Sequence, residues 1–215
     1  MITWLSPDDP PDRFPPHHAA LSDPPGLLAA GGDLRLERLI AAYRRGIFPW
    51  YSPGQPVLWW SPDPREVMLP SEFHRSRSLL RAQRLRGFEW CEDRDFPAVV
   101  AACAAPRARS PGTWITAEMQ AAYCALYRRG LAHSYEIWRA NRLVGGVYGV
   151  RLGCVYFGES MFSKEPDASK AALSGLVEHS ARLGIELIDC QLPSAHLRSL
   201  GSRAMPRAQF LRYLE

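Results

Sequence analysis

A strand–helix–strand pattern between Gly158 and Gln191 constrains the fold of this chain more than any other feature. The segment GESMFSKEPDASKAALSGLVEHSARLGIELIDCQ combines a strand end, a polar loop, a helix over 167–183 and a second strand over 185–192. Gly184 stops the helix. Its inward face is apolar at helical spacing: Ala172, Leu173, Leu176 and Val177. A connection of this length implies a right-handed crossover, so we expect the two strands to be parallel neighbours.

Three short segments before this unit predict an antiparallel meander. HSYEIW, LVGGVYGV and CVYFGES are rich in aromatic and β-branched residues, and tight turns at 140–142 and 152–153 separate them. Helices over 95–104 and 117–129 precede the meander, joined by the loop RARSPGTWIT with Thr116 as a helix cap. The elements predict an α+β fold, a mixed sheet with helices packed on it. Their order resembles the fold of the GCN5-related N-acetyltransferases.

The N-terminal part differs in composition and predicts a small separate domain. Residues 1–30 are rich in proline, which lacks a backbone donor, so we expect an extended surface arm. A helix over about 34–45 follows, with Asp33 as its cap and Gly46 as its stop. Prolines then separate five aromatic residues: Phe48, Trp50, Tyr51, Trp59 and Trp60. These form either the wall of a binding site or plain interdomain core. We place the boundary between a domain over 1–64 and an acyltransferase-like domain over 65–215.

A cluster of arginines without any acid lies in the segment HRSRSLLRAQRLRG. On a helix, Arg77, Arg81 and Arg84 share one face, where like charges repel. An RNA backbone would relieve that repulsion. A solvated basic face is the alternative. The cluster consists of Arg75, Arg77, Arg81, Arg84 and Arg86.

Several classes of protein are excluded by missing signals. The chain has no signal-peptide pattern and no apolar run of about 18 residues, so we expect a cytoplasmic protein that does not enter membranes. Five scattered cysteines without a C-x-x-C motif favour free thiols over disulfides or zinc. Neither a nucleophile elbow nor a phosphate-binding P-loop is present, and the histidines form no metal pair. The glycine-rich loop that binds coenzyme A is also missing, so we expect no cofactor and no metal.

Three polar residues at strand ends are candidates for catalysis. Alternation along 185–192 places Asp189 and Gln191 on the face that also carries Leu187, at the end of the strand where clefts open in parallel sheets. Glu159 is expected to end the preceding strand. If the strands are neighbours, two carboxylates and one amide converge in one crevice. The alternative is a turn cap at Asp189 and an exposed acid at Glu159.

Eight motifs, in order, resemble those of the leucyl/phenylalanyl-tRNA–protein transferases, over about residues 21–214. They are GGDLRLERLIAAYRRGIFPW, WWSPDPR, GTWIT, HSYEIW, LVGGVYGV, GESMFS, ASKAAL and LIDCQ. The resemblance implies an enzyme that moves Leu or Phe, and less well Met, from aminoacyl-tRNA to the N-terminal Arg or Lys of a protein. The product would then enter the bacterial N-end rule pathway. We expect a monomer.

The resemblance also implies roles for individual residues. The substrate-binding positions are Trp50, Trp114, Tyr156, Met161, Ser163 and Leu176. Of these, Trp50 and Trp114 would line the pocket for the aminoacyl side chain and the terminal adenosine. The polar groups at the reacting centre are Glu159, Asp189 and Gln191, and the arginine cluster would hold the tRNA acceptor arm. We expect Asp189 to orient Gln191, which would hydrogen-bond the attacking amine and help its proton leave, while both acids face the cationic N-terminus. A coenzyme-A-dependent acyltransferase and a non-catalytic RNA-binding module stay open as alternatives.

Overall fold

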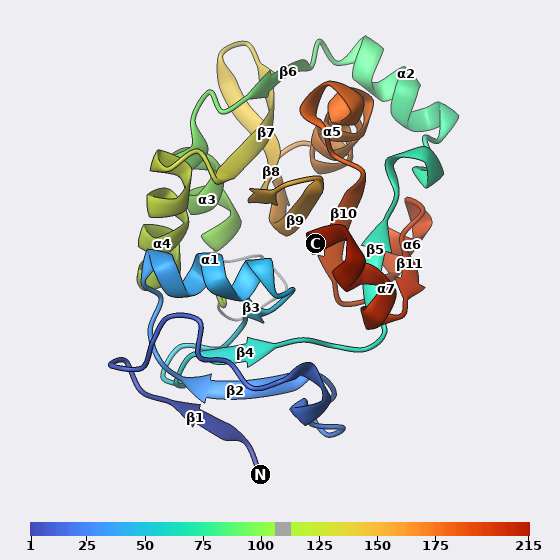
Figure 1. Cartoon of the computed structure of the whole chain (residues 1–215). Coiled ribbons are helices and arrows are strands. Elements are labelled where there is room, and N and C mark those ends of the chain that lie inside the picture. The colour runs from blue at the N-terminus through green and yellow to red at the C-terminus, as the bar shows by residue number, and fades with distance from the viewer. Residues whose placement is uncertain (106–112) are drawn as a thin grey trace.

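Two sheets organise the chain in the computed structural model, which describes residues 1–105 and 113–215 except the side chains of residues 78 and 82–84. A four-stranded sheet has the order β1-β2-β4-β3, and a seven-stranded sheet has the order β11-β5-β10-β9-β8-β7-β6. In Figure 1 the smaller sheet lies below the larger one, and helix α1 lies between them. This mixed α+β architecture agrees with the predicted fold class. Most of the loop RARSPGTWIT lies outside the described residues.

The centre of the large sheet is the predicted meander and crossover. Strands β7 (Ala132–Arg139), β8 (Arg142–Leu152) and β9 (Val155–Ser163) pair antiparallel in sequence order. Helix α5 (Ala168–Leu183) then leads to β10 (Leu187–Gln191), which pairs parallel with β9. Gly184 ends α5 with a φ of 67°. The meander and the parallel crossover are both confirmed.

Three strands of the large sheet were not predicted. They are β5 (Arg65–Met68), β6 (Glu89–Glu92) and β11 (Arg203–Met205). Strand β5 pairs antiparallel with β10 and with β11, so β10 is an interior strand and its end is enclosed on both sides. The sequence signal of β5 is hidden because it has only four residues and follows a Pro-rich stretch.

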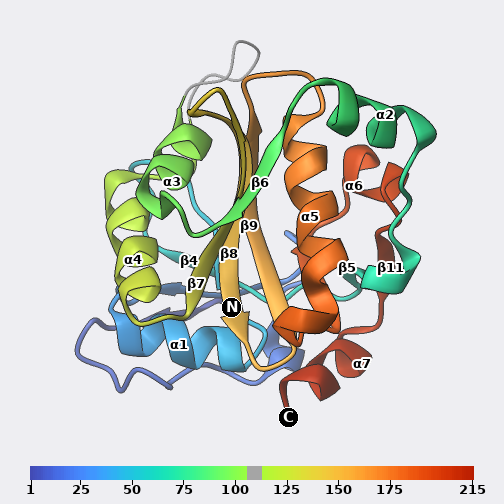
Figure 2. The same cartoon turned by 90° about the horizontal axis from the view of Figure 1, so that it is seen from above.

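Helices cover both faces of the large sheet. Helices α3 (Phe96–Ala104) and α4 (Ala117–Arg128) lie on one face, and α5 with α2 (Arg77–Leu85) lies on the other, as Figure 2 shows. Thr116 caps α4 by accepting from the N–H of Met119, as predicted. The C-terminal segment adds the short helices α6 (Ala195–Ser199) and α7 (Arg207–Leu211). Among the described residues, no helix has the length and apolar character that crossing a bilayer requires.

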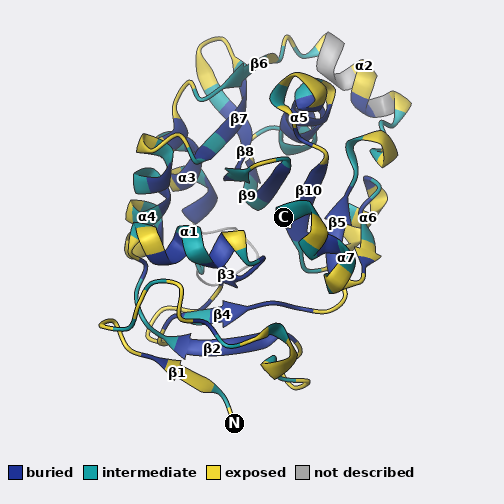
Figure 3. Cartoon of the chain, in the orientation of Figure 1, coloured by how far each residue is buried: buried dark blue, intermediate teal, exposed yellow. Residues whose placement is uncertain are grey.

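The N-terminal segment is more deeply built into the fold than we expected. Strands β1 (Thr3–Leu5), β2 (Leu27–Gly31), β3 (Phe48–Pro49) and β4 (Leu58–Trp60) form the small sheet, and β2 is an interior strand. The residues from Leu27 to Ala30 are buried, as the dark blue of β2 in Figure 3 shows. A surface arm over all of 1–30 is therefore wrong. The prolines of this segment all precede the apolar run, so its backbone donors are intact.

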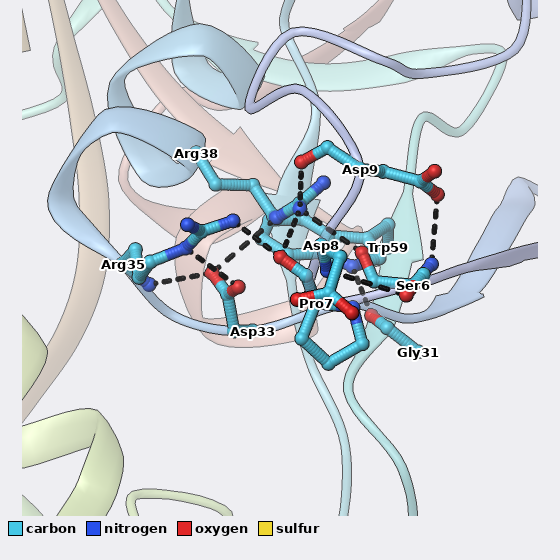
Figure 4. Close-up of polar contacts among 9 residues, drawn as sticks. All are labelled: Ser6, Pro7, Asp8, Asp9, Gly31, Asp33, Arg35, Arg38 and Trp59. Carbon is cyan, nitrogen blue, oxygen red and sulfur yellow. Dashed lines mark hydrogen bonds and ion pairs between the residues drawn. The ribbon is translucent and has the colours of Figure 1, made fainter.

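Buried Arg38 of α1 (Leu36–Arg44) fastens the first turn of the chain to this sheet, as Figure 4 shows. Its guanidinium donates to the carbonyl oxygens of Ser6 and Asp9 at 3.2 and 3.0 Å. It also pairs with Asp33 at 3.3 Å. We had expected Asp33 to cap α1, and the structure corrects this: no side chain among the described residues caps the helix. The Asp33 carboxylate accepts from the N–H of Arg35 and binds two arginine side chains, so no oxygen reaches the free N–H groups of the helix.

Candidate active site

Glu159 lies in the middle of β9 and not at its end, which corrects the expectation from the sequence. The register of β8 and β9 pairs Gly149 with Gly158 but Tyr148 with Ser160, so Glu159 is the extra residue of a β-bulge. A bulge redirects a side chain that regular alternation would place elsewhere. Gly149 permits it, because a Cβ there would lie 2.0 Å from the carbonyl oxygen of Phe157. Sequence alternation alone does not reveal such a bulge.

Two tyrosines hold both oxygens of the Glu159 carboxylate. Tyr43 of α1 donates its O–H to Oε1 at 2.7 Å, and Tyr123 of α4 donates to Oε2 at 2.6 Å. Burial raises the pKa of Glu159 to about 7, although the hydrogen bonds from Tyr123 and Tyr43 oppose the shift. A carboxylate with this pKa can exchange a proton near neutral pH. Sequence reasoning missed both tyrosines because they lie 80 residues apart in the chain, on two different helices.

The carboxylate of Asp189 forms an ion pair with Arg65 of β5, so its negative charge is balanced within the protein. The Nε and Nη2 atoms of Arg65 donate to the two Asp189 oxygens, each at 2.7 Å, and both side chains are 0% exposed. The rings of Phe48 and Phe210 stack near the guanidinium, at 4.7 and 4.8 Å from their centroids. Such a pair is strongly held because neither partner can be solvated alone. Arg65 was not predicted as a partner, because the strand that carries it was missed.

Asp189 also fixes the backbone of Gln191. Its Oδ1 accepts from the Gln191 N–H at 3.0 Å, and Gln191 adopts a φ of 57°. The sheet register shifts between these two residues, so the strict alternation that we expected along β10 is interrupted at Cys190. The amide nitrogen of the Gln191 side chain is buried and has no hydrogen-bond partner among the described residues. A donor left without a partner in a pocket wall is available to a ligand.

Three cavities meet around these polar groups. A cavity of about 370 Å³ lies behind Glu159 and Gln191, and its wall is largely apolar. A cavity of about 200 Å³ and another of about 700 Å³ adjoin it, and Trp114 lines all three. Trp50 lines the second and third of these. The apolar wall of the first cavity includes Val147, Tyr156, Met161, Leu173, Ile188 and Leu197.

Three of the expected substrate-binding residues do not line the cavity of about 370 Å³ that Tyr156 and Met161 line. Trp50 lines the two adjoining cavities instead. The other two are Leu176 and Ser163. Leu176 is 0% exposed and packs in the core beneath α5. Ser163 lines another groove, which shares Met161 and His196 with the apolar cavity. Its hydroxyl accepts from the N–H of Ser169 at 2.7 Å and thereby supports the start of α5. Leu176 stays outside because α5 presents Leu173 to the cavity instead.

The arginine cluster divides into two groups. Arg77 and Arg81 of α2 are exposed. Arg75 and Arg86 instead bind the neighbourhood of α5, through the carbonyl oxygens of Ser174 at 3.3 Å and Pro166 at 2.7 Å. Arg75 also pairs with Glu178 at 3.5 Å. The side chain of Arg84 lies outside the described part of the structure. Two arginines thus anchor the helix, while two face solvent.

The described residues contain one group with the spacing of metal ligands, and it is separate from these cavities. The ligand atoms of Glu92, Asp93 and His133 lie within 4.8 Å of one another. The Nδ1 of His133 already binds Asp93 at 2.7 Å, and the other Asp93 oxygen accepts from the N–H of Ser134 at 2.7 Å. These hydrogen bonds explain why the three residues lie together: they link β7 to the residue that follows β6.

The cavities and polar groups define a class of site. An apolar pocket ends at a carboxylate that exchanges protons near pH 7 and at an amide donor without a partner. This arrangement suits the transfer of an acyl group to an amine, since that reaction requires a positioned carbonyl and a proton acceptor. The class is therefore that of the acyltransferases.

Comparison with known proteins identifies the family. The family model for leucyl/phenylalanyl-tRNA protein transferase matches residues 67–215, and the model for its N-terminal domain matches residues 32–63. A curated relative of that name from Pseudomonas entomophila (strain L48) is 58% identical over 214 residues, covering 100% of this chain and 94% of the relative. Another from Pseudomonas aeruginosa (strain LESB58) is 56% identical over 215 residues, with the same coverage. The chain belongs to the leucyl/phenylalanyl-tRNA–protein transferase family.

Solved structures give a weaker likeness. L-PGS from Bacillus licheniformis matches with a TM-score of 0.44 and 11% sequence identity, over 78% of this chain and 53% of that chain. A conserved protein of unknown function from Staphylococcus epidermidis ATCC 12228 also matches with a TM-score of 0.44, at 10% identity, over 84% of this chain and 68% of that chain.

Proposed function

We propose that this protein transfers Leu or Phe, and less efficiently Met, from aminoacyl-tRNA to the N-terminal Arg or Lys of acceptor proteins. The observation that carries this proposal is the junction of the apolar cavity with Glu159 and Gln191. Its volume of about 370 Å³ and its lining suit an unbranched or branched apolar side chain or a phenyl ring. Burial in such a pocket discriminates poorly among apolar side chains of similar size, which is why Met should be tolerated.

The reaction needs no covalent enzyme intermediate, because the aminoacyl ester is already activated. The neutral acceptor amine attacks the ester carbonyl carbon, and a carbon–nitrogen bond forms as the bond to the ribose oxygen breaks. The amide N–H of Gln191 can donate to the carbonyl oxygen as negative charge develops there. The amine loses a proton, and the departing ribose oxygen gains one.

Glu159 is the best candidate to carry that proton. Its pKa of about 7 lets it accept the proton from the amine and return it to the ribose oxygen. Asp189 is bound on both oxygens by Arg65 and is fully buried, so we assign it a positioning role. Because the charge of Asp189 is already paired with Arg65, only Glu159 would attract the cationic Arg or Lys side chain of the acceptor. Hydrogen bonds from Tyr43 and Tyr123 keep its carboxylate in place.

We extend the proposal to the setting of the reaction. Arg77 and Arg81 would contact the tRNA backbone, and the products would enter the N-end rule degradation pathway in the cytoplasm. We infer a monomer that requires neither a metal nor a cofactor. The larger domain, over 65–215, would share its strand order with the GCN5-related N-acetyltransferases, and the smaller one would span 1–64.

A direct transfer assay tests the proposal. Purified protein is mixed with labelled Leu-tRNA or Phe-tRNA and a peptide that begins with Arg, and the label should move to the peptide. The same peptide with an acetylated N-terminus should stay unlabelled, because it lacks the attacking amine. Binding of the tRNA without transfer would favour a non-catalytic RNA-binding module. Transfer from an acyl-coenzyme A would favour a coenzyme-A-dependent acyltransferase.

A further inference from the structure

Glu66 of β5 is a buried acid that the proposed mechanism does not use. It lies opposite Gln191 in the register of β5 and β10, and it is 2% exposed. The neighbouring strand carries Asp189, but the two acids bind different parts of the chain. Asp189 binds Arg65 within the sheet, whereas Glu66 binds the segment that follows β10. Charged side chains are almost never fully buried unless they are paired, so the partners of Glu66 indicate its role.

Glu66 fastens helix α6 and the residues after it to the large sheet. Its Oε1 accepts from the hydroxyl of Ser202 at 2.6 Å and from the Nε of Arg198 at 3.3 Å. Arg198 belongs to α6 and its side chain is 59% exposed, so Glu66 is the buried member of this ion pair. Figures 1 and 2 show α6 beside β5 and β11. The pair therefore links a short surface helix to an interior strand.

Helix α6 also forms part of the wall of the apolar cavity. Ser194 caps the helix by accepting from the N–H of Leu197 at 3.1 Å. Both residues line the cavity, together with His196 of the same helix. The opposing wall includes Leu173 of α5 and Ile188 of β10. A helix of five residues is not stable on its own, so the position of this wall depends on the contacts that hold α6.

The residues after α6 are held independently of the ion pair. Leu200 is 4% exposed, and its carbonyl oxygen accepts from the N–H of His74 at 2.9 Å. Gly201 follows with a φ of 105°, and a Cβ there would lie 2.2 Å from the carbonyl oxygen of Glu72. These contacts fix the chain beyond the helix, whereas the ion pair acts on the helix itself. Loss of the pair should therefore loosen α6 without detaching the whole segment.

We propose that Glu66 is a positioning residue for donor selection: its ion pair with Arg198 keeps α6 in place, so that Leu197 limits the size of the aminoacyl side chain in the apolar cavity. This role rests on the proposed function, since the aminoacyl group must enter that cavity. A wall that recedes admits a larger side chain, and a smaller one loses contacts with it. One methylene group in an apolar pocket changes selectivity by about 10–200-fold, so a small displacement of Leu197 alters the preference between Leu and Phe.

A competition assay tests this role. One tRNA is acylated chemically with either Leu or Phe, and equal amounts of the two donors compete for an Arg peptide at low conversion. The product ratio of Phe to Leu gives the ratio of the two kcat/KM values, and it does not depend on the fraction of folded enzyme. Leu197→Ala should raise this ratio about tenfold. Glu66→Ala and Arg198→Ala should each raise it by a smaller factor, because the leucine side chain remains.

Further variants assign the effect to the ion pair. Glu66→Gln should lie between Glu66→Ala and the wild type, because its amide oxygen still accepts from Ser202 and Arg198. The double variant Glu66→Ala with Arg198→Ala should shift the ratio no further than either single variant, because both break the same pair. Arg203→Ala is the matched control. It removes the same charge and breaks an ion pair with Glu72 at 2.7 Å, but it lies outside α6 and should keep the wild-type ratio.

Two results would overturn the positioning role. One is a wild-type ratio in both Glu66→Ala and Arg198→Ala; the second of these changes a largely exposed side chain and should fold normally. The other is an equal shift in Arg198→Ala and Arg203→Ala, since the effect would then come from net charge. If the wild-type protein transfers neither Leu nor Phe, the proposed function itself fails, and that result is distinct because it yields no product ratio.

Discussion

Arg65 and Asp189 form a fully buried ion pair in which two guanidinium nitrogens contact the two carboxylate oxygens at 2.7 Å. The pair joins β5 to β10 directly behind Gln191. Asp189 therefore holds the site in shape, and the loss of activity in an Asp189 variant would not by itself show proton transfer.

Asp189→Asn should lower the free energy of unfolding by about 3–5 kcal/mol, because it leaves the Arg65 charge buried without a counter-ion. The double variant Arg65→Met with Asp189→Asn should recover part of that loss. Urea denaturation measures both. A variant Asp189→Asn with wild-type stability and no activity would contradict the positioning role and return Asp189 to the chemistry.

Gln191→Ala should lower kcat by about 10²–10³-fold, in line with the loss of one donor to a developing oxyanion. The KM for aminoacyl-tRNA should change little, because the hydrogen bond to the carbonyl oxygen strengthens only as negative charge develops there in the transition state. Steady-state transfer rates at saturating Arg peptide measure the two parameters. Cys190→Ser, one residue away on the same cavity wall, serves as a control for the local packing. A rise in KM alone would show that Gln191 only binds the donor.

Glu159 should give the pH profile an ionisation near pH 7. Its pKa of about 7 means that the carboxylate, which accepts the proton, becomes populated as the pH rises through that value. Transfer should therefore increase with pH there, and the acceptor amine, with a pKa of about 8, should add a second increase. In Glu159→Gln the first ionisation should be absent and the second should remain.

Tyr43→Phe offers a matched control for this assignment. The hydrogen bond from Tyr43 stabilises the charged form and lowers the pKa of Glu159, so its removal should move the first ionisation upward. An ionisation that stays near pH 7 in both variants would belong to another group. Because its pKa is raised on folding, protonated Glu159 contributes stability that is complete below about pH 4.5 and lost as the pH rises through about 7. Glu159→Gln should remove that loss.

The two exposed arginines of α2 should set part of the salt dependence of tRNA binding. Replacing Arg77 and Arg81 with Ala should weaken binding and reduce the slope of log K against log salt by about 1.5, since each phosphate contact contributes about 0.7–0.9. Arg128→Ala with Arg129→Ala removes the same charge from the end of α4, on the opposite side of the large sheet (Figure 2). That control should keep the wild-type slope. An equal change in both double variants would reflect net charge alone.

The sequence allowed the central sheet to be predicted, because periodicity and turn residues mark strands and helices that are long enough to repeat. Strand β5 has four residues, too few for a period to show, and with it Arg65 was missed. The bulge at Glu159 was missed for another reason: it depends on how two strands pair, and local residue types do not encode that directly. Asp189 and Gln191 were placed at the correct strand end, but Arg65, the partner of Asp189, comes from a distant segment of the chain.

Gly149 should be essential to the geometry of Glu159. A Cβ at this position would lie 2.0 Å from the carbonyl oxygen of Phe157, a backbone atom that cannot move without separating β8 from β9. Gly149→Ala should therefore destabilise the protein by about 1–3 kcal/mol or more, as overpacking does, and displace the bulge that carries Glu159. The ionisation near pH 7 should shift or disappear in the remaining folded protein.

Gly158→Ala is the matched control for stability. It alters the glycine paired with Gly149, yet its added Cβ would meet nothing closer than 3.6 Å. Thermal unfolding should therefore show a clear loss for Gly149→Ala and little change for Gly158→Ala. If both variants unfold like the wild type, β8 and β9 can separate at low cost, and the bulge is not held by the close approach at Gly149. If both lose the same stability, neither of the two paired positions tolerates a Cβ, and the effect is not specific to the contact with Phe157.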